Sequence, residues 1–260
     1  MSEIQISVFL FILGTCVGSF LNVIIYRIPR KMPIVRPPSR CPQCGSPIRP
    51  YDNLPILSFL ILRGRCRSCL ARISFRYPLV EAWAGLLLVG LYFKFGLTLA
   101  LLIHALLCLS LVVVFFIDYY HTTIPDVITL PGIGLAIGQS FIPDGISPIS
   151  SLVGIVAGGG ALAAVAFLGR AAFRREAMGV GDIKLAAMVG GFLGWRLLFL
   201  SLFLASLLGA LLGGILILLK VRSKGSAIPF GPFIVFGSMA SLFWGNRVIE
   251  TYLSVFQGPH

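Results

Sequence analysis

The sequence predicts an all-α, polytopic membrane protein: a helix bundle of about eight transmembrane helices with a small cytoplasmic zinc-ribbon-like loop domain. Three observations predict this class. Of the 260 residues, 57% are hydrophobic and 12% are charged, whereas a soluble domain carries about 25% charge. Apolar segments long enough to enter a bilayer recur along the chain. A long polar segment carries two CxxC motifs.

The apolar segments give the predicted spans. A fully spanning helix needs about 20 residues, and the first segment meets this length. It is too long for the apolar region of a signal peptide and no basic residue precedes it, so we expect it to be retained. Three others are short, and 183–195 is the shortest. The predicted spans are 4–25, 78–93, 97–117, 127–142, 146–169, 183–195, 197–219 and 228–250.

These spans divide the chain into three predicted parts. The first transmembrane helix occupies 1–26, a cytoplasmic four-cysteine loop domain occupies 27–77, and the remaining bundle occupies 78–260. Glycines recur inside the spans of the bundle, among them Gly158 and Gly190. In lipid such small residues permit close packing between helices.

Positive charge is concentrated on one side of the predicted membrane. The formal net charge is +12, and the segment 27–76 alone contains eleven Lys or Arg and one acid. If this loop is cytoplasmic, the alternation of spans places eighteen of the twenty-one Lys and Arg on or next to the cytoplasmic side. The positive-inside rule then predicts that both termini lie outside. Topology and anionic lipid explain these charges without a nucleic-acid partner.

Four of the six cysteines form the motifs CPQC and CRSC, separated by 21 residues. Paired knuckles of this kind bring four thiolates to one tetrahedral zinc ion. Disulfides fit a reducing cytoplasm poorly, although disulfides and unligated thiols remain alternatives. Zinc would also stabilise a loop with little apolar core. The predicted zinc ligands are Cys41, Cys44, Cys66 and Cys69. We expect the remaining two, Cys16 and Cys108, to be packing residues in spans.

Two aspartates lie next to apolar segments, at positions where a charged side chain is unfavourable in a membrane protein. Asp118 ends an unbroken apolar stretch, at a helix C-terminus where the macrodipole disfavours negative charge. Asp182 stands between glycines in GVGDIK, on the same predicted membrane face. By contrast, Asp126 can cap the next helix, and Glu81 can pair with an arginine of the loop.

Two carboxylates about 4 Å apart repel by about 4 kcal/mol at an effective dielectric constant near 20. Such a pair can therefore hold one shared proton near neutral pH. One carboxylate then activates a water molecule while the other donates a proton, as in aspartic proteases. We expect Asp118 and Asp182 to form this dyad.

Other interpretations of the same residues remain open. Asp182 can pair with Lys184, or cap a helix that begins at Ile183. Asp118 can pair with His121 one turn along. An ion pathway would make the protein a transporter or proton channel, although the outer halves of most spans lack the polar groups that this needs. A non-enzymatic assembly factor could use the zinc loop for docking.

Several motifs, in this order, are similar to those of a known family. Taken together, they resemble the prepilin leader peptidases of type IV pilus and type II secretion systems, which are GxGD-type intramembrane aspartic proteases and N-methyltransferases. The resemblance covers nearly the whole chain. The motifs are GSFLNVIIYRIP at 18–29, the CPQC and CRSC pairs, RYPLVE at 76–81, FIDYYHTTIPD at 116–126, GVGDIKL at 179–185 and IPFGPF at 228–233.

The resemblance implies an activity and its participants. Asp118 and Asp182 would be the catalytic aspartates, and the four cysteines would match the family's zinc-binding set. Type IV prepilins or pseudopilins would lose a short basic leader, after a glycine, at the cytoplasmic face of the bacterial inner membrane. The new N-terminus would then be methylated with S-adenosylmethionine. Asn22 and Arg27 mark where we would look for this second activity.

Overall fold

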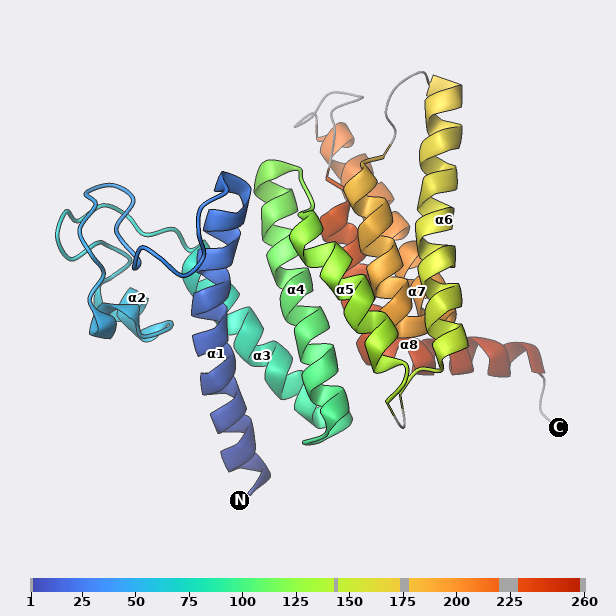
Figure 1. The fold of residues 1–260 in the computed structure, drawn as a ribbon, viewed down its shortest axis with the longest axis horizontal. Coiled ribbons are helices and arrows are strands. Elements are labelled where there is room, and N and C mark those ends of the chain that lie inside the picture. Colours follow the sequence, from blue (N-terminus) through green and yellow to red (C-terminus); the bar gives the residue numbers. More distant parts are fainter. Residues whose placement is uncertain (1, 143–144, 174–177, 220–228, 258–260) are drawn as a thin grey trace. The chain divides into compact units, whose positions relative to one another are not determined.

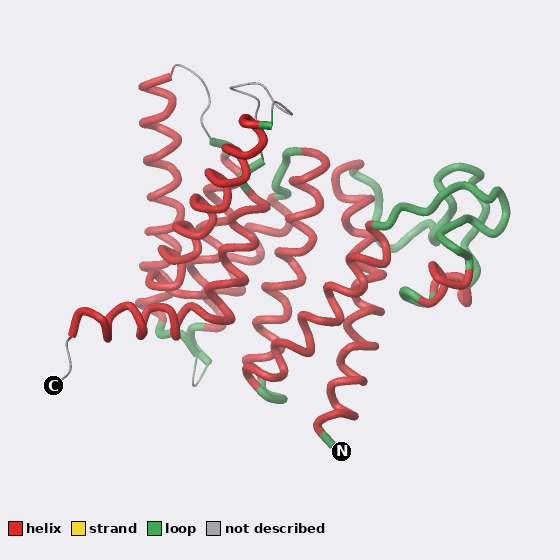
Figure 2. Tube along the Cα trace, turned by 180° about the vertical axis from the view of Figure 1, so that it is seen from behind, coloured by secondary structure: helices red, strands yellow, loops and turns green. Residues whose placement is uncertain are grey.

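The computed structural model describes residues 2–142, 145–173, 178–219 and 229–257. Within these ranges the protein is helical and forms no strand beyond two isolated bridges, which confirms the all-α class (Figures 1 and 2). The chain divides into two compact units, Met1–Val113 and Val114–His260. The helices are α1 Glu3–Arg27, the 3-10 helices Ile28–Arg30 and Pro50–Asn53, α2 Leu57–Ile61, α3 Arg76–Phe95, α4 Leu99–His121, α5 Asp126–Gln139, α6 Pro148–Phe173, α7 Val180–Leu218 and α8 Gly231–Gln257.

In the first unit α1 packs directly on α3. The close approach depends on small residues, because a methyl group on Gly14 would lie 2.7 Å from the Ala84 carbonyl oxygen. A methyl group on Gly18 would meet the Glu81 Cα at the same distance. α1 begins with a capping box, in which Ser2 and Gln5 satisfy each other's backbone N–H groups.

The core of the second unit is the first part of α7, which packs against α5, α6 and α8. Every residue from 185 to 194 is buried, as expected for a helix that is apolar all round. α7 is interrupted at Gly194, whose φ of 74° and ψ of 166° are not helical. The predicted segments 183–195 and 197–219 are thus the two parts of one broken helix. Glycine tolerates this positive φ, which strains other residues.

The break in α7 leaves backbone carbonyls without helical partners, and two buried side chains supply donors. Gln139 Nε2 lies 3.4 Å from the Gly191 carbonyl oxygen and 3.2 Å from that of Phe192. Ser151 Oγ donates to the Gly191 carbonyl at 2.9 Å. A broken helix in an apolar environment requires such donors, because water cannot supply them there.

Glycines also allow α6 and α7 to cross at backbone contact. A methyl group on Gly154 would collide with the Gly190 carbonyl, and one on Gly158 would collide with that of Ala186. The expectation of close glycine-mediated packing is confirmed for these positions. A methyl group on the neighbouring Gly160 would have nothing within 4 Å, so this glycine takes no part in the crossing.

We expect Gly158→Ala to destabilise the bundle, because its methyl group would push the two helix backbones apart. Overpacking of this kind costs about 1–3 kcal/mol. Gly160→Ala is the matched control on the same helix, and it should be neutral or slightly stabilising because alanine favours helix formation. Thermal unfolding in lipid nanodiscs would compare the two. Equal melting temperatures would contradict the tight crossing.

Five helices of the described residues are long and apolar enough to cross a membrane: Glu3–Arg30, Arg76–Phe95, Leu99–His121, Pro148–Ala172 and Val180–Leu218. Every predicted apolar segment overlaps a helix. The segment 127–142 forms α5, which has 14 residues and contains Pro131, so it is shorter than a full span. The structure therefore supports a polytopic helical membrane protein.

Candidate active site and metal centre

Asp118 and Asp182 line one pocket of the second unit, with a volume of about 560 Å³. The end of α4, the turn after it, the start of α5 and the start of α7 form the walls. Asp118 comes from α4 and Asp182 from α7, so the structure brings the two predicted carboxylates to the wall of one pocket. The pocket is lined by Asp118, Thr122, Thr123, Ile124, Pro125, Asp126, Gly179, Val180, Gly181, Asp182 and Lys184.

Asp118 is buried in the last turn of α4, with 5% of its surface exposed. Its Oδ2 has no hydrogen-bond partner, while the backbone N–H of Gly231 faces the carboxylate. Gly231 is the first residue of α8. The N-terminus of α8 therefore compensates for the unfavourable dipole at the end of α4, a counterpart that the sequence alone does not reveal.

Asp182 lies in the first turn of α7 and is half-buried. Its Oδ1 has no hydrogen-bond partner, and the backbone N–H of Gly179 faces the carboxylate. Negative charge is favoured at this position because it lies at the positive end of the α7 dipole. Each aspartate thus combines a helix N-terminus with an unpaired buried oxygen, an arrangement suited to a shared proton and a bound water.

The structure contradicts several simpler interpretations of these acids. Lys184 Nζ binds Asp126 Oδ2 at 2.7 Å rather than Asp182. α7 begins at Val180, so Asp182 is inside the first turn instead of capping a helix at 183. Asp126 likewise is the first residue of α5 and makes no capping bond. No ion pair joins Asp118 to a histidine among the described residues.

Two residues that sequence reasoning did not single out bring the pocket walls together. Ile124, from the turn after α4, packs against Gly181. A methyl group on Gly181 would lie 2.8 Å from the Cβ of Ile124. A methyl group on Gly231 would lie 2.5 Å from Asp118 Oδ2. The second glycine of GVGD is therefore needed for a close contact. The motif IPFGPF contained the signal for Gly231, but its partner is distant in sequence.

The four motif cysteines of the first unit form one cluster, with all four sulfur atoms within 4.8 Å of one another. The sulfurs of Cys41 and Cys69 are 3.9 Å apart. A tetrahedral ion with zinc–sulfur bonds of about 2.3 Å would place its sulfurs about 3.8 Å apart. The donor set and its spacing therefore fit one structural zinc ion.

The two CxxC motifs form similar knuckles. In each, the first cysteine N–H donates across the turn, from Cys41 to the Ser46 carbonyl and from Cys66 to that of Ala71. Gly45 takes the positive φ of the first knuckle, but Leu70 takes it in the second. Outside the spans, hydrogen bonds with Ser46 lower the pKa of Cys44 to about 6, which favours its thiolate, whereas burial and the other three cysteines raise the pKa of Cys69 to about 12.

Several other predicted roles change in the structure. Glu81 Oε2 accepts the backbone N–H of Ile56 at 2.7 Å, so its partner is a loop amide instead of an arginine. Arg27 is buried and donates to the carbonyls of Pro33, Ile34 and Pro37.

Of the two remaining cysteines, Cys108 is a packing residue as expected, but Cys16 is exposed on its unit. Asn22 is buried and donates from Nδ2 to the Tyr77 carbonyl at 3.1 Å. Its Oδ1 has no hydrogen-bond partner. Asn22 therefore links α1 to the start of α3.

Comparison with known proteins places the chain in a family. The family model for the bacterial peptidase A24 N-terminal domain matches residues 12–95, and that for the type IV leader peptidase family matches residues 105–214. No solved structure gives a significant match.

Similar proteins carry the name prepilin leader peptidase/N-methyltransferase. That of Pseudomonas aeruginosa is 37% identical over 93% of this chain and 91% of its own length. That of Pseudomonas putida is 36% identical over 94% of this chain and 92% of its own length. That of Myxococcus xanthus is 46% identical over 74% of this chain, which spans 57% of that relative. The chain belongs to the type IV leader peptidase family.

Proposed function

We propose that this chain is a membrane-embedded aspartic endopeptidase that removes the basic leader of type IV prepilins or pseudopilins and then methylates the new N-terminus. The observation that carries the proposal is the pocket in which Asp118 and Asp182 meet, each with an unpaired buried oxygen. The names of the relatives support the same activity over the transporter alternative.

In the proposed mechanism one carboxylate is ionised and the other is protonated. Water attacks the scissile carbonyl carbon and gives a proton to the ionised carboxylate, while the protonated one donates to the carbonyl oxygen. The resulting tetrahedral diol then collapses and the C–N bond breaks. The amine takes the proton that came from water, and a diol hydroxyl returns the other, so both aspartates regain their starting states.

The substrate backbone must be extended at the cut, because a helical peptide bond keeps its carbonyl inside the helix. Gly179 and Gly181 line the same pocket as the aspartates and, having no side chains, leave the backbone accessible there. This favours entry of an unfolded junction between the leader and the apolar pilin helix. The turn at Thr122, with its positive φ of 50°, forms another part of the wall.

We propose that the pocket and the cysteine loop face the cytoplasm and that both termini face outward. The support is the distribution of Lys and Arg, of which eleven lie within 27–76. We also propose that the loop domain at 27–77 and the bundle at 78–260 act as separate functional parts. A cytoplasmic active site would meet prepilins before their export.

The second proposed reaction transfers a methyl group from S-adenosylmethionine to the free amine of the shortened pilin. When bound, S-adenosylmethionine would supply an electrophilic methyl group on its sulfonium: the amine would gain the methyl and lose a proton, while the S–CH3 bond breaks and S-adenosylhomocysteine leaves. Asn22 and Arg27 contact backbone carbonyls of their own unit. We therefore assign them no step in methyl transfer.

We expect Gly231→Ala to reduce leader cleavage at least about tenfold, because the new methyl group would displace the Asp118 carboxylate from its aligned position. Gly134→Ala is a matched control, since nothing lies within 4 Å of a side chain there. Initial cleavage rates of the two variants would be compared in nanodiscs. A normal rate for Gly231→Ala would show that this contact does not position Asp118.

The whole proposal is tested with purified protein in nanodiscs, a synthetic prepilin and labelled S-adenosylmethionine. Mass spectrometry would detect the cut, and label on the mature peptide would detect methyl transfer. Absence of cleavage would refute the peptidase assignment. Cleavage without label would refute only the second activity. Proton flux in liposomes that depends on Asp182 would instead favour the channel.

A further inference from the structure

The cysteine loop carries an apolar surface that its zinc knuckles do not use. Four large apolar residues at 54–61, in and just before α2, have about half or more of their surface exposed. Single exposed apolar residues are ordinary, but a cluster marks an interaction surface. The members of this α2 patch are Leu54 (49%), Leu57 (57%), Leu60 (63%) and Ile61 (71%).

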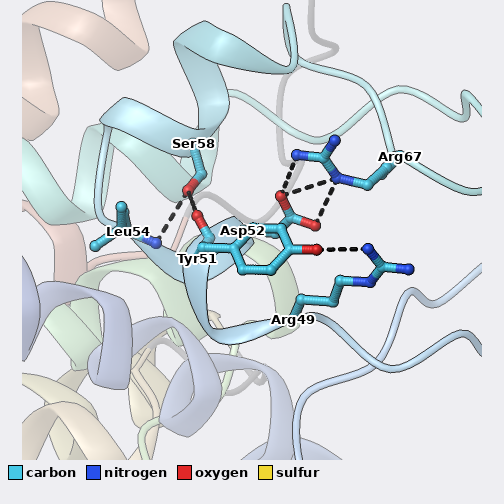
Figure 3. A network of polar contacts seen from close by, with 6 residues as sticks. All are labelled: Arg49, Tyr51, Asp52, Leu54, Ser58 and Arg67. Carbon is cyan, nitrogen blue, oxygen red and sulfur yellow. Dashed lines mark hydrogen bonds and ion pairs between the residues drawn. The ribbon is translucent and has the colours of Figure 1, made fainter.

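Polar contacts among the residues before and within α2 hold the segment in shape (Figure 3). Ser58 is buried, donates to the Tyr51 carbonyl at 3.0 Å and accepts the Leu54 N–H at 3.0 Å. Arg67 binds Asp52 at 2.6 Å and lowers the pKa of that carboxyl. The apolar side chains are therefore presented outward by a built framework.

Contacts with α3 set the level of α2 relative to the membrane-spanning helices. The N–H of Ile56, the residue before α2, donates to Glu81 at 2.7 Å. Glu81 is the sixth residue of α3, about 7.5 Å along the helix axis from Arg76. Figures 1 and 2 both show α2 at a level between the two ends of α1. α2 thus lies beside the spanning helices instead of beyond their ends.

The charges near the patch match a lipid surface. Arg49, Arg63 and Arg65 are exposed in the same loop, and the segment 27–76 contains a single acid. Basic residues next to an apolar face favour anionic headgroups. Interfacial helices bury their apolar face about 5–10 Å into the headgroup and acyl boundary, which agrees with the level set by Glu81.

We propose that the α2 patch inserts into the lipid interface and fixes the cysteine loop against the bilayer that α1 and α3 cross. The bilayer is the occupant that the position of α2 and the arginines favour. A polypeptide partner, or another part of this chain, would require the patch to be shielded from lipid. The proposal concerns the loop's attachment and is independent of the catalytic assignment.

The test places a fluorinated tryptophan at Leu60 in the full-length protein in nanodiscs containing anionic lipid. Fluorine NMR separates its signal from those of the three native tryptophans. A nitroxide carried by lipid and a gadolinium chelate in water are added in separate samples. We expect lipid nitroxide to relax the Leu60→Trp signal at least about threefold more than that of Val35→Trp, an exposed loop position.

Three outcomes decide the proposal. Stronger relaxation by lipid supports it, and Leu57→Trp provides the same measurement if Leu60→Trp does not fold. Relaxation by gadolinium equal to that of Val35→Trp would show that the patch faces water. Protection from both agents would show that protein covers it. Either of the last two results overturns the proposal.

A second measurement tests attachment without a probe. Replacing Leu60 and Ile61 together by aspartate should increase hydrogen exchange at the Ile56 amide at least about tenfold in nanodiscs, because the loop would leave the interface. Ile48→Asp, an exposed apolar residue of the same loop, is the control. Equal exchange in both variants contradicts lipid attachment.

Discussion

Asp118→Asn and Asp182→Asn are each expected to lower the rate of leader cleavage by at least about a hundredfold, within the usual contribution of general acid–base catalysis. Asparagine keeps the shape of aspartate but cannot exchange the proton. Among the described residues neither carboxylate forms an ion pair, and each has an unpaired buried oxygen, so the substitution removes no ion pair seen there. Cleavage of a synthetic prepilin, with thermal unfolding measured on the same samples, checks the prediction.

The pocket itself offers a matched control. Asp126 lines it too, but its carboxylate is bound to Lys184 at 2.7 Å and is exposed. Loss of an exposed ion pair costs about 0.2–1 kcal/mol, so Asp126→Asn should change cleavage less than about tenfold. A large loss in Asp126→Asn with little loss in Asp118→Asn would transfer the catalytic role away from the proposed dyad.

Removal of zinc is expected to unfold the cysteine loop. Structural zinc supplies about 10–16 kcal/mol of binding energy in zinc-finger peptides at neutral pH, and the knuckle turns carry few other bonds. Cys41→Ser should therefore reduce bound zinc from one ion per chain to almost none. Amides inside the knuckles, such as those of Cys66 and Gly45, should exchange much faster. Elemental analysis and hydrogen exchange measure the two effects.

Cys16→Ser is the control for loss of a thiol, because this cysteine lies outside the cluster and is exposed. Cys16→Ser should retain one zinc ion per chain and normal hydrogen exchange at the knuckle amides. The spans should remain folded after zinc loss, since their packing depends on helix contacts such as that between Gly18 and α3. Full zinc content in Cys41→Ser would contradict the four-sulfur site.

Local signals in the sequence predicted much of this architecture. Hydropathy located the helices, and the spacing of the cysteines located the metal cluster, because both depend on neighbouring residues. The partner of Lys184 was not predictable in this way. Asp182 is two residues away but points into the pocket, while Asp126 reaches Lys184 from another helix.

Backbone contacts between distant segments were the least predictable feature. Gly231 gave no local sign that its amide faces Asp118, and Gly194 was one glycine among many in an apolar run. Its role depends on Gln139, which supplies a hydrogen bond near the break from a helix far away in sequence. Such positions are defined by tertiary packing, so a single sequence gives the residue type without the partner.

The shortness of two neighbouring helices has a consequence for the surrounding lipid. α5 has 14 residues, and α7 runs only from Val180 to its break at Gly194 before changing direction. Each is therefore about 21 Å long, against about 30 Å for the hydrocarbon core. The first part of α7 is buried, but α5 exposes Leu130 and Leu135, so hydrophobic mismatch should thin the bilayer along α5. Where the bilayer is thinner, bulk water would reach the first residues of α5 and α7. It would supply the water for hydrolysis without a channel through the protein.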